Sequence, residues 1–227
     1  MSAGAATSSA RGAHTCAAAS RWLESWKQTY AAQVVDPSRL YREPGRHPFT
    51  TLSTSDRYGF PTTVTLLERR TLCGGARWYR IRYAHWPNGS SGWIRAHGVR
   101  TTRLHIRIVV DESRHELWLY KRGRVVLKTP AAIGKPSTPT PLGTFFVTQR
   151  FLVTDQFGPY GPRAIGISAF SNVLRTWTDG GPIGIHGTNE PFSIGKPVSH
   201  GCIRLPNHAI LRLFAIVPLG TPVTIRR

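Results

Sequence analysis

One histidine and one cysteine in the carboxyl-terminal part of the chain have the residue types and spacing for nucleophilic chemistry. His186 and Cys202 are sixteen positions apart, and each has a glycine neighbour, Gly187 or Gly201. A thiol becomes a strong nucleophile when it loses its proton, and a nearby imidazole can accept that proton and hold the thiolate as an ion pair. We therefore predict that Cys202 is a catalytic nucleophile. His186 is its predicted general base, which later protonates a leaving amine.

The two glycines are predicted to shape the space around the sulfur. Gly187 and Gly201 carry no Cβ, so the backbone can turn sharply there and another molecule can approach closely. If the N–H groups of Gly201 and Cys202 point the same way, they could stabilise an oxyanion that forms beside the sulfur. This arrangement is typical of a cysteine enzyme that transfers acyl groups.

Three polar residues flank the cysteine and are predicted to support it. Arg204 could lower the thiol pKa or bind a substrate carboxylate through two hydrogen bonds. The alternative for Arg204 is a structural ion pair with Asp155 or Asp179. His200 could line an oxyanion pocket or hold the loop, and we favour the supporting role. Ser199 is likewise expected to organise the loop.

Two segments resemble the active-site signature of a known family. His186-Gly187-Thr188 together with residues 199–205 (Ser-His-Gly-Cys-Ile-Arg-Leu) is similar to the signature of the L,D-transpeptidases of bacterial cell walls, the YkuD-type catalytic domain. Residues 134–145 resemble the segment that follows the first hairpin of that domain. Both segments occur in the family's order, and they tie the resemblance to residues 104–227.

The resemblance implies a function in peptidoglycan synthesis. Cys202 would attack a tetrapeptide stem before its terminal D-alanine, and a neighbouring stem would resolve the thioester to give a 3→3 cross-link. Water as the acceptor would make the protein an L,D-carboxypeptidase, and a non-catalytic wall-binding protein is a further alternative. The implied partners are peptidoglycan stem peptides, and carbapenem-type β-lactams are expected to acylate the cysteine. No cofactor is implied.

A zinc hydrolase is a competing class. His186, His200, Cys202 and His208 are all capable metal ligands, and such an enzyme needs three of them plus a water molecule. Their spacing matches no familiar zinc pattern, and no carboxylate is positioned as a base. We therefore expect no metal.

The elements that must position the pair are mostly strands. The pattern predicts a mostly β catalytic domain at 103–227, with strands near 104–110, 116–120, 125–127, 144–147, 164–167 and 222–225. A single carboxyl-terminal helix is predicted over about 207–217, between start signals at Pro206 and Asn207 and a stop at Pro218.

The amino-terminal part is predicted to be a separate small domain. Residues 36–102 hold strands near 62–67, 78–83 and 92–94 and resemble a bacterial SH3-like β-barrel, which implies wall attachment or packing against the catalytic domain. Residues 1–35 are predicted to be a flexible leader followed by a short helix from Ser20 to about Val35, because Trp22, Leu23, Trp26 and Tyr30 recur at helical spacing.

The composition bounds the partners and the compartment. The net charge is +19, divided as +9 over residues 1–100 and +10 over 101–227, so it is spread over the chain. Such a field suits anionic wall polymers. No block of five like charges and no basic helix indicates nucleic-acid binding, which is not expected.

No secretory signal is recognisable in residues 1–20, so an extracytoplasmic location, in the cell wall or periplasm, follows from the resemblance alone. Cys16 and Cys73 either pair or stay as two small unpaired residues.

Overall fold

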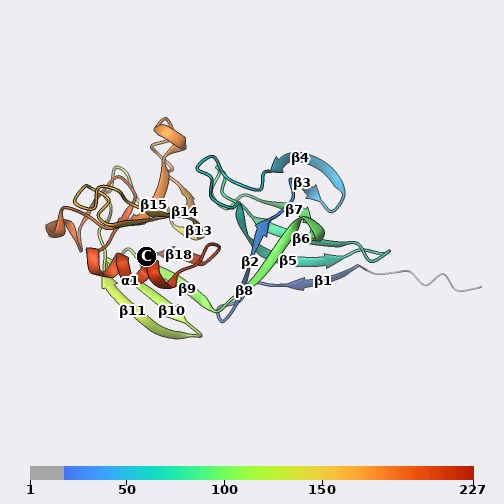
Figure 1. Cartoon of the computed structure of the whole chain (residues 1–227), viewed down its shortest axis with the longest axis horizontal. Coiled ribbons are helices and arrows are strands. Elements are labelled where there is room, and N and C mark those ends of the chain that lie inside the picture. Colours follow the sequence, from blue (N-terminus) through green and yellow to red (C-terminus); the bar gives the residue numbers. More distant parts are fainter. Residues whose placement is uncertain (1–17) are drawn as a thin grey trace, which may run out of the picture.

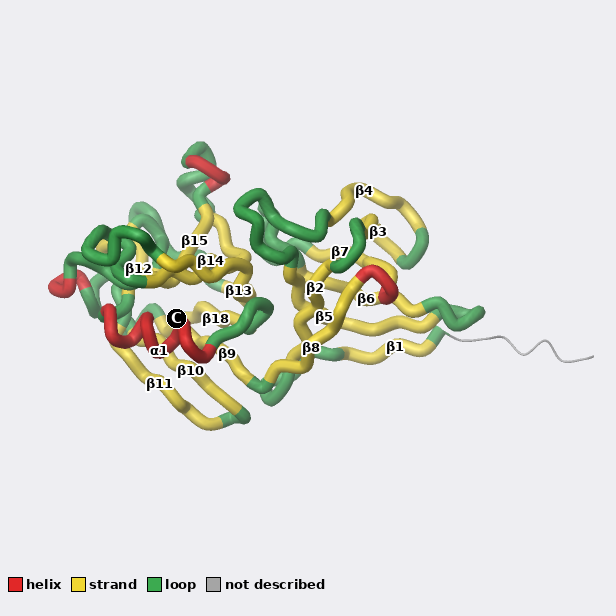
Figure 2. The backbone as a smooth tube through the Cα atoms, in the orientation of Figure 1, coloured by secondary structure: helices red, strands yellow, loops and turns green. Residues whose placement is uncertain are grey.

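Alternating apolar residues fold about half of the described chain into strands, and the strands form two sheet units that lie side by side (Figure 1). The computed structural model describes residues 18–227. Strands dominate both units, and loops make most of the connections (Figure 2). Within the described range, no helix has the length and apolar character needed to cross a bilayer.

The N-terminal unit is an eight-stranded sheet. Its elements are β1 (Ala19–Trp22), β2 (Thr29–Val34), β3 (Ser38–Glu43), β4 (Arg46–Leu52), β5 (Thr63–Thr71), β6 (Arg77–Arg82), β7 (Ser91–Arg95), the 3-10 turn η1 (Ala96–Gly98) and β8 (Val99–Leu104). The strand order is β4-β3-β7-β6-β5-β2-β8, and β1 pairs with β5. Its small core includes Leu40, Leu66 and Ile81.

The C-terminal unit holds a second eight-stranded sheet and the helix. Its elements are β9 (Ile106–Asp111), β10 (Glu116–Lys121), β11 (Arg124–Pro130), β12 (Ile133–Gly134), β13 (Gly143–Leu152), β14 (Arg163–Phe170), η2 (Thr178–Gly180), β15 (Pro182–His186), η3 (Pro191–Ser193), β16 (Pro197–Ser199), β17 (Ile203–Arg204), α1 (Asn207–Ile216) and β18 (Pro222–Arg226). The sheet order is β11-β10-β9-β18-β13-β14-β15-β17, and β12 pairs separately with β16.

The larger core lies in this C-terminal unit and includes Phe145, Ile165 and Leu213. The helix α1 buries Ala209, Ile210 and Leu213, which follow helical spacing. The predicted mostly β fold with one carboxyl-terminal helix is therefore confirmed.

The helix predicted from Ser20 to Val35 is wrong. Residues in this segment form β1 and β2, and β2 pairs with β5 on one side and β8 on the other. Trp22 and Trp26, which suggested a helical stripe, are 65% and 54% exposed, so they form no buried face. Long-range strand pairing has overridden a local periodicity. Residues 19–34 thus belong to the N-terminal sheet. Of the leader predicted over residues 1–19, Ala19 lies in β1 and residues 1–17 lie outside the described range.

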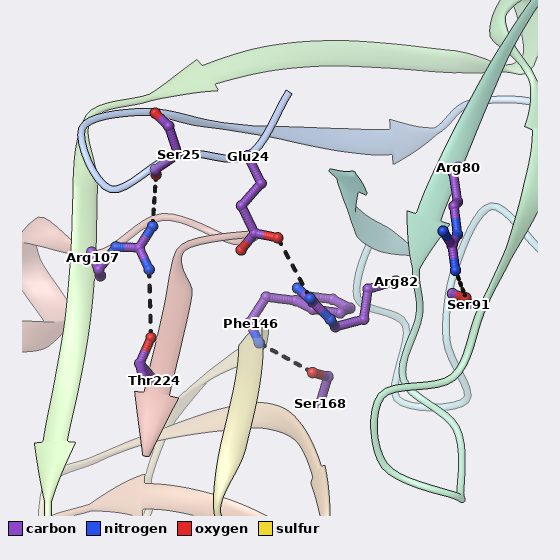
Figure 3. Close-up of polar contacts among 9 residues, drawn as sticks. All are labelled: Glu24, Ser25, Arg80, Arg82, Ser91, Arg107, Phe146, Ser168 and Thr224. Atoms are coloured by element: carbon purple, nitrogen blue, oxygen red, sulfur yellow. Dashed lines mark hydrogen bonds and ion pairs between the residues drawn. The ribbon is translucent and has the colours of Figure 1, made fainter. Parts of the chain in front are cut away.

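Polar contacts of Arg107 join the two units. The buried Arg107 of β9 donates to the Ser25 carbonyl oxygen at 2.8 Å and approaches Thr224 of β18 at 3.5 Å (Figure 3). Nearby, Arg82 pairs with Glu24 at 3.5 Å within the N-terminal unit. Because the Ser25 loop belongs to the N-terminal unit and Thr224 to the C-terminal one, Arg107 fastens one unit to the other.

Candidate active site

The cysteine and the histidine are brought together by two neighbouring parallel strands. β15 pairs with β17 so that Ile185 faces Ile203, and Cys202 directly precedes β17. The Cys202 Sγ accepts a hydrogen bond from the Gly184 N–H at 3.4 Å. His186 lies two residues after Gly184 on β15, so both residues are on the same face of that strand. Cys202 and His186 line the same two pockets.

The histidine is held in one tautomer. His186 is 5% exposed, and its Nδ1 lies 2.6 Å from the carbonyl oxygen of Gly187. A carbonyl only accepts, so Nδ1 must carry the proton, and Nε2 is left as the basic nitrogen. The ring of Tyr160 packs edge-on against the imidazole, with the ring centroids 4.9 Å apart. The imidazole is therefore oriented by its own backbone and by an aromatic neighbour.

The resting pair is neutral. Burial is the main reason that the pKa of His186 is lowered to about 4; the Gly187 carbonyl acts in the opposite direction, and the nearby charge of Arg204 makes a smaller lowering contribution. Burial raises the pKa of the Cys202 thiol, against the smaller effects of the Gly184 N–H and Arg204. At neutral pH the sulfur keeps its proton and the imidazole is free to accept one. This differs from the thiolate–imidazolium pair expected from the sequence.

A serine hydroxyl organises the turn that carries the cysteine. Ser199 is 1% exposed, and its Oγ donates to the Cys202 carbonyl at 2.6 Å and accepts from the Gly201 N–H at 3.1 Å. This second bond occupies the Gly201 N–H, so the amide expected to help stabilise an oxyanion is already used within the turn. Ser199 lies where the sequence predicted a loop organiser.

Gly201 is required by its backbone and its surroundings. Its φ is +116°, in the region that favours glycine, and a Cβ there would lie 2.8 Å from Cδ1 of Ile183. Its carbonyl accepts a hydrogen bond from the Thr140 hydroxyl at 2.9 Å, and the Thr138 hydroxyl donates to the Ser199 carbonyl at 3.1 Å. The upstream segment 134–145 therefore braces the cysteine turn directly. Thr138 and Thr140 lie in the segment that resembles the family, but their types and spacing alone predicted no role for them.

Arg204 is anchored by a carboxylate that the sequence did not indicate. Its guanidinium forms an ion pair with Glu190, whereas Asp179, one of the two partners considered, pairs with Arg57. Arg204 still lines the pocket beside Cys202. It can therefore present positive charge to a bound carboxylate while Glu190 orients it.

Gly187 is tightly packed, whereas His200 is exposed at the surface. A Cβ on Gly187 would lie 2.4 Å from the Asn207 Oδ1, which also accepts from the Thr188 N–H at 2.9 Å. Gly187 is thus needed for the close approach of the His186 segment to the start of α1. His200 is exposed and lies against Trp177, with ring centroids 5.3 Å apart, at the rim of the pocket.

Two pockets meet at the cysteine. The first, of about 150 Å³, is lined by polar and aromatic residues that include Tyr160, Trp177 and His200. The second, of about 290 Å³, is more apolar and includes Gln149, Phe151 and Tyr160. Across residues 18–227, no three His, Cys, Asp or Glu side chains are grouped as metal ligands, so the zinc alternative has no ligand set there. Tyr160, Trp177 and Gln149 gave no signal in the sequence.

Comparisons with known proteins identify relatives of the C-terminal unit. Residues 105–225 match the family model of the YkuD-type L,D-transpeptidase catalytic domain. The putative L,D-transpeptidase YkuD of Bacillus licheniformis is 42% identical over 119 residues, covering 52% of this chain and 64% of the relative. L,D-transpeptidase 1 of Mycobacterium tuberculosis is 31% identical over 206 residues, covering 73% of this chain and 76% of the relative.

Two solved structures are also similar to parts of this chain. The catalytic domain of an Enterococcus faecium L,D-transpeptidase is 30% identical, with a TM-score of 0.39, and the match covers 53% of this chain and 95% of that one. L,D-transpeptidase 3 of Mycobacterium tuberculosis, solved with a faropenem-derived adduct, is 16% identical with a TM-score of 0.44, covering 67% and 91%. The chain spans 64% and 65% of the length of the YkuD relatives from Bacillus licheniformis and Bacillus subtilis.

Proposed function

This chain belongs to the L,D-transpeptidase family, and from that membership we propose that it is a peptidoglycan transpeptidase that forms 3→3 cross-links through a cysteine thioester. The observation that supports this most is that Cys202, directly before β17, and His186, on the neighbouring strand β15, line the same two pockets. The two pockets that share Cys202 offer space beside the sulfur for the donor stem and, after D-alanine leaves, for the acceptor.

The first half-reaction follows from the neutral resting pair. As the donor stem binds, Nε2 of His186 takes the thiol proton and the Cys202 sulfur attacks the carbonyl before the terminal D-alanine. The carbon–sulfur bond forms and the carbon–nitrogen bond breaks. His186 returns the proton to the departing amine, so D-alanine leaves and a thioester remains.

The second half-reaction reverses these proton movements. The side-chain amine of a neighbouring stem attacks the thioester and gives a proton to Nε2 of His186. The new amide forms, the carbon–sulfur bond breaks, and the sulfur takes the proton back. Arg204 is proposed to attract the carboxylate of a stem peptide at the pocket rim, and the Cys202 N–H is proposed to stabilise the oxyanion.

The proposed setting is extracytoplasmic, because the substrate lies in the wall. The N-terminal unit is proposed to act as an SH3-like wall-attachment module, and the charge of +19 favours association with anionic wall polymers. Release of the protein from wall pellets by moderate salt would support an electrostatic partner, whereas association that does not respond to salt would oppose it.

Intact-mass measurement after exposure to a carbapenem tests the nucleophile. The wild-type protein should gain one adduct and Cys202→Ala none. Cys202→Ser, the variant closest in shape, serves as a second control. An adduct on both proteins, or on neither, would contradict the assignment. Analysis of muropeptides after incubation with the purified protein distinguishes cross-linked dimers from trimmed tripeptides, and tripeptides alone would identify an L,D-carboxypeptidase.

A further inference from the structure

The walls of both pockets are held by a loop from the other unit. This β4–β5 loop, residues 53–62, leaves the N-terminal sheet and reaches toward the segment before β15 (Figure 1). That segment, residues 171–181 between β14 and β15, is named here the β14–β15 connection. Four loop residues make the contacts described below, and none of them lines either pocket at Cys202: Asp56, Arg57, Tyr58 and Phe60. They act only by touching residues that do line these pockets, or that belong to the same segments.

The β4–β5 loop is rigid enough to act as a brace. The Oδ1 of Asp56 accepts from the N–H groups of Tyr58 and Phe60, both at 2.9 Å, and the Asp56 N–H donates to the Phe60 carbonyl at 2.8 Å. These bonds close a compact turn around one carboxylate. The second oxygen of that carboxylate is left to point toward the C-terminal unit.

The first contact is with a wall of the apolar pocket. Gln149 donates from Nε2 to the Asp56 Oδ2 at 2.6 Å. The rings of Phe60 and Tyr58 pack edge-on against Phe151, with centroids 4.9 and 6.0 Å apart. Gln149 and Phe151 both line the pocket that contains Cys202. The loop therefore fixes two side chains of this wall.

The second contact is with a wall of the polar pocket. The Tyr58 hydroxyl donates to Asp179, and the Arg57 guanidinium forms an ion pair with the same carboxylate. Asp179 belongs to the β14–β15 connection, which supplies Leu174 and Trp177 to the pocket. The connection contains no strand, so its position depends on such contacts.

A neighbouring turn of the N-terminal unit strengthens this second contact. Asn88 pairs with the backbone of Phe170 through two hydrogen bonds, of 2.8 and 2.9 Å, at the point where β14 ends. The Arg175 guanidinium lies 3.5 Å from the ring centroid of Trp86. The connection is thus held by the N-terminal unit at its start, its middle and near its end.

We propose that the β4–β5 loop is a positioning element for the transpeptidase site, in which Tyr58 and Arg57 hold the β14–β15 connection, and Asp56 holds Gln149, in the arrangement that binds the donor stem. The proposal rests on the proposed function. It assigns the N-terminal unit a role in substrate binding that is separate from wall attachment. If the loop is loosened, only a fraction of molecules has the binding-competent arrangement. The apparent affinity for the donor then falls to that fraction of its full value.

The test compares steady-state kinetics of donor consumption, with a tetrapeptide stem ending in D-alanine, in the wild type, Tyr58→Phe, Arg57→Ala and the combined variant that carries both substitutions. Tyr58→Phe keeps the ring that packs on Phe151 and removes only the hydroxyl that bonds Asp179. We expect KM to rise about fivefold in the combined variant while kcat changes little. The rate of alkylation of Cys202 by iodoacetamide should stay at the wild-type value, because this small reagent needs no shaped pocket.

Arg107→Ala is the matched control, because it removes a contact between the units away from both pockets (Figure 3). It is expected to lower thermal stability and to keep the wild-type KM. A KM that is unchanged in the loop variants, or raised equally by Arg107→Ala, would overturn the positioning role while leaving the proposed function intact. A wild-type protein that consumes no donor and forms no thioester would instead refute the proposed function.

Discussion

The buried, neutral His186 should make the stability of this protein fall as the medium becomes mildly acidic. Its pKa is lowered from 6.5 to about 4 in the folded protein, mainly because burial opposes the charged form. Between these two values the unfolded chain binds a proton that the folded protein does not. By linkage, the free energy of unfolding therefore rises with pH across this window and is lost as pH falls through it.

The magnitude follows from the two pKa values. A histidine that titrates at 6.5 unfolded and at about 4 folded costs roughly 2 kcal/mol of stability between pH 7 and pH 5, and roughly 3 kcal/mol by pH 4. The perturbation that isolates this contribution is His186→Asn, because the Asn amide can still donate to the Gly187 carbonyl but does not titrate.

The assay is urea unfolding at pH 7 and pH 5, followed by tryptophan fluorescence. The quantity compared is the loss of stability between the two pH values, so a constant destabilisation of the variant cancels. The wild type should lose about 2 kcal/mol more than His186→Asn over this interval. His208→Asn, on an exposed site of α1, keeps His186 and should show the wild-type loss. Equal losses in the wild type and His186→Asn would refute the conclusion that the imidazole is buried and neutral.

Three further outcomes are expected. The rate of Cys202 acylation by a carbapenem should be level from pH 7 to pH 5 and fall near pH 4, where His186 gains its proton; a fall already centred near pH 6.5 would contradict a lowered pKa. Ser199→Ala removes the hydroxyl that bonds the Gly201 N–H and the Cys202 carbonyl, so it should cost about 1–3 kcal/mol in urea unfolding and slow acylation; unchanged stability and rate would show that the turn needs no such brace. Gly201→Ala forces a Cβ to within 2.8 Å of the Ile183 side chain at a φ of +116°, and it should cost at least about 1–3 kcal/mol in the same unfolding assay; a variant as stable as the wild type would contradict the strain.

The sequence was sufficient for elements whose pattern is local. Strands such as β6 and β10 follow from alternating residues, and α1 follows from its start and stop signals. β2 was missed because its identity depends on pairing with β5 and β8, and a local pattern does not report distant partners. The two-residue strands β12 and β17 are too short to show any periodicity.

In the site, too, some residues are indicated by the local sequence and others only by the folded structure. The spacing of His186 and Cys202 and the resemblance of the surrounding motif were sufficient to select both residues as candidates. Glu190, the partner of Arg204, and Gln149, the partner of Asp56, come from segments that only folding brings close. The pKa directions also depend on burial, which favours the neutral thiol and imidazole over the thiolate–imidazolium pair expected from the sequence.

The positioning contacts of the β4–β5 loop matter because the resting pair of Cys202 and His186 is neutral. A thiol that keeps its proton is a weak nucleophile toward molecules that collide with it at random. In the proposed reaction the carbonyl, the sulfur and Nε2 of His186 must meet when the proton moves, so turnover at low donor concentration depends on the fraction of molecules whose pocket walls are arranged to bind the donor. Those walls include Trp177 on the β14–β15 connection and Gln149 on β13, and both segments are held by the β4–β5 loop. We therefore expect this site to depend more on the N-terminal unit for the wall arrangement that binds the donor than a site with a permanent thiolate would.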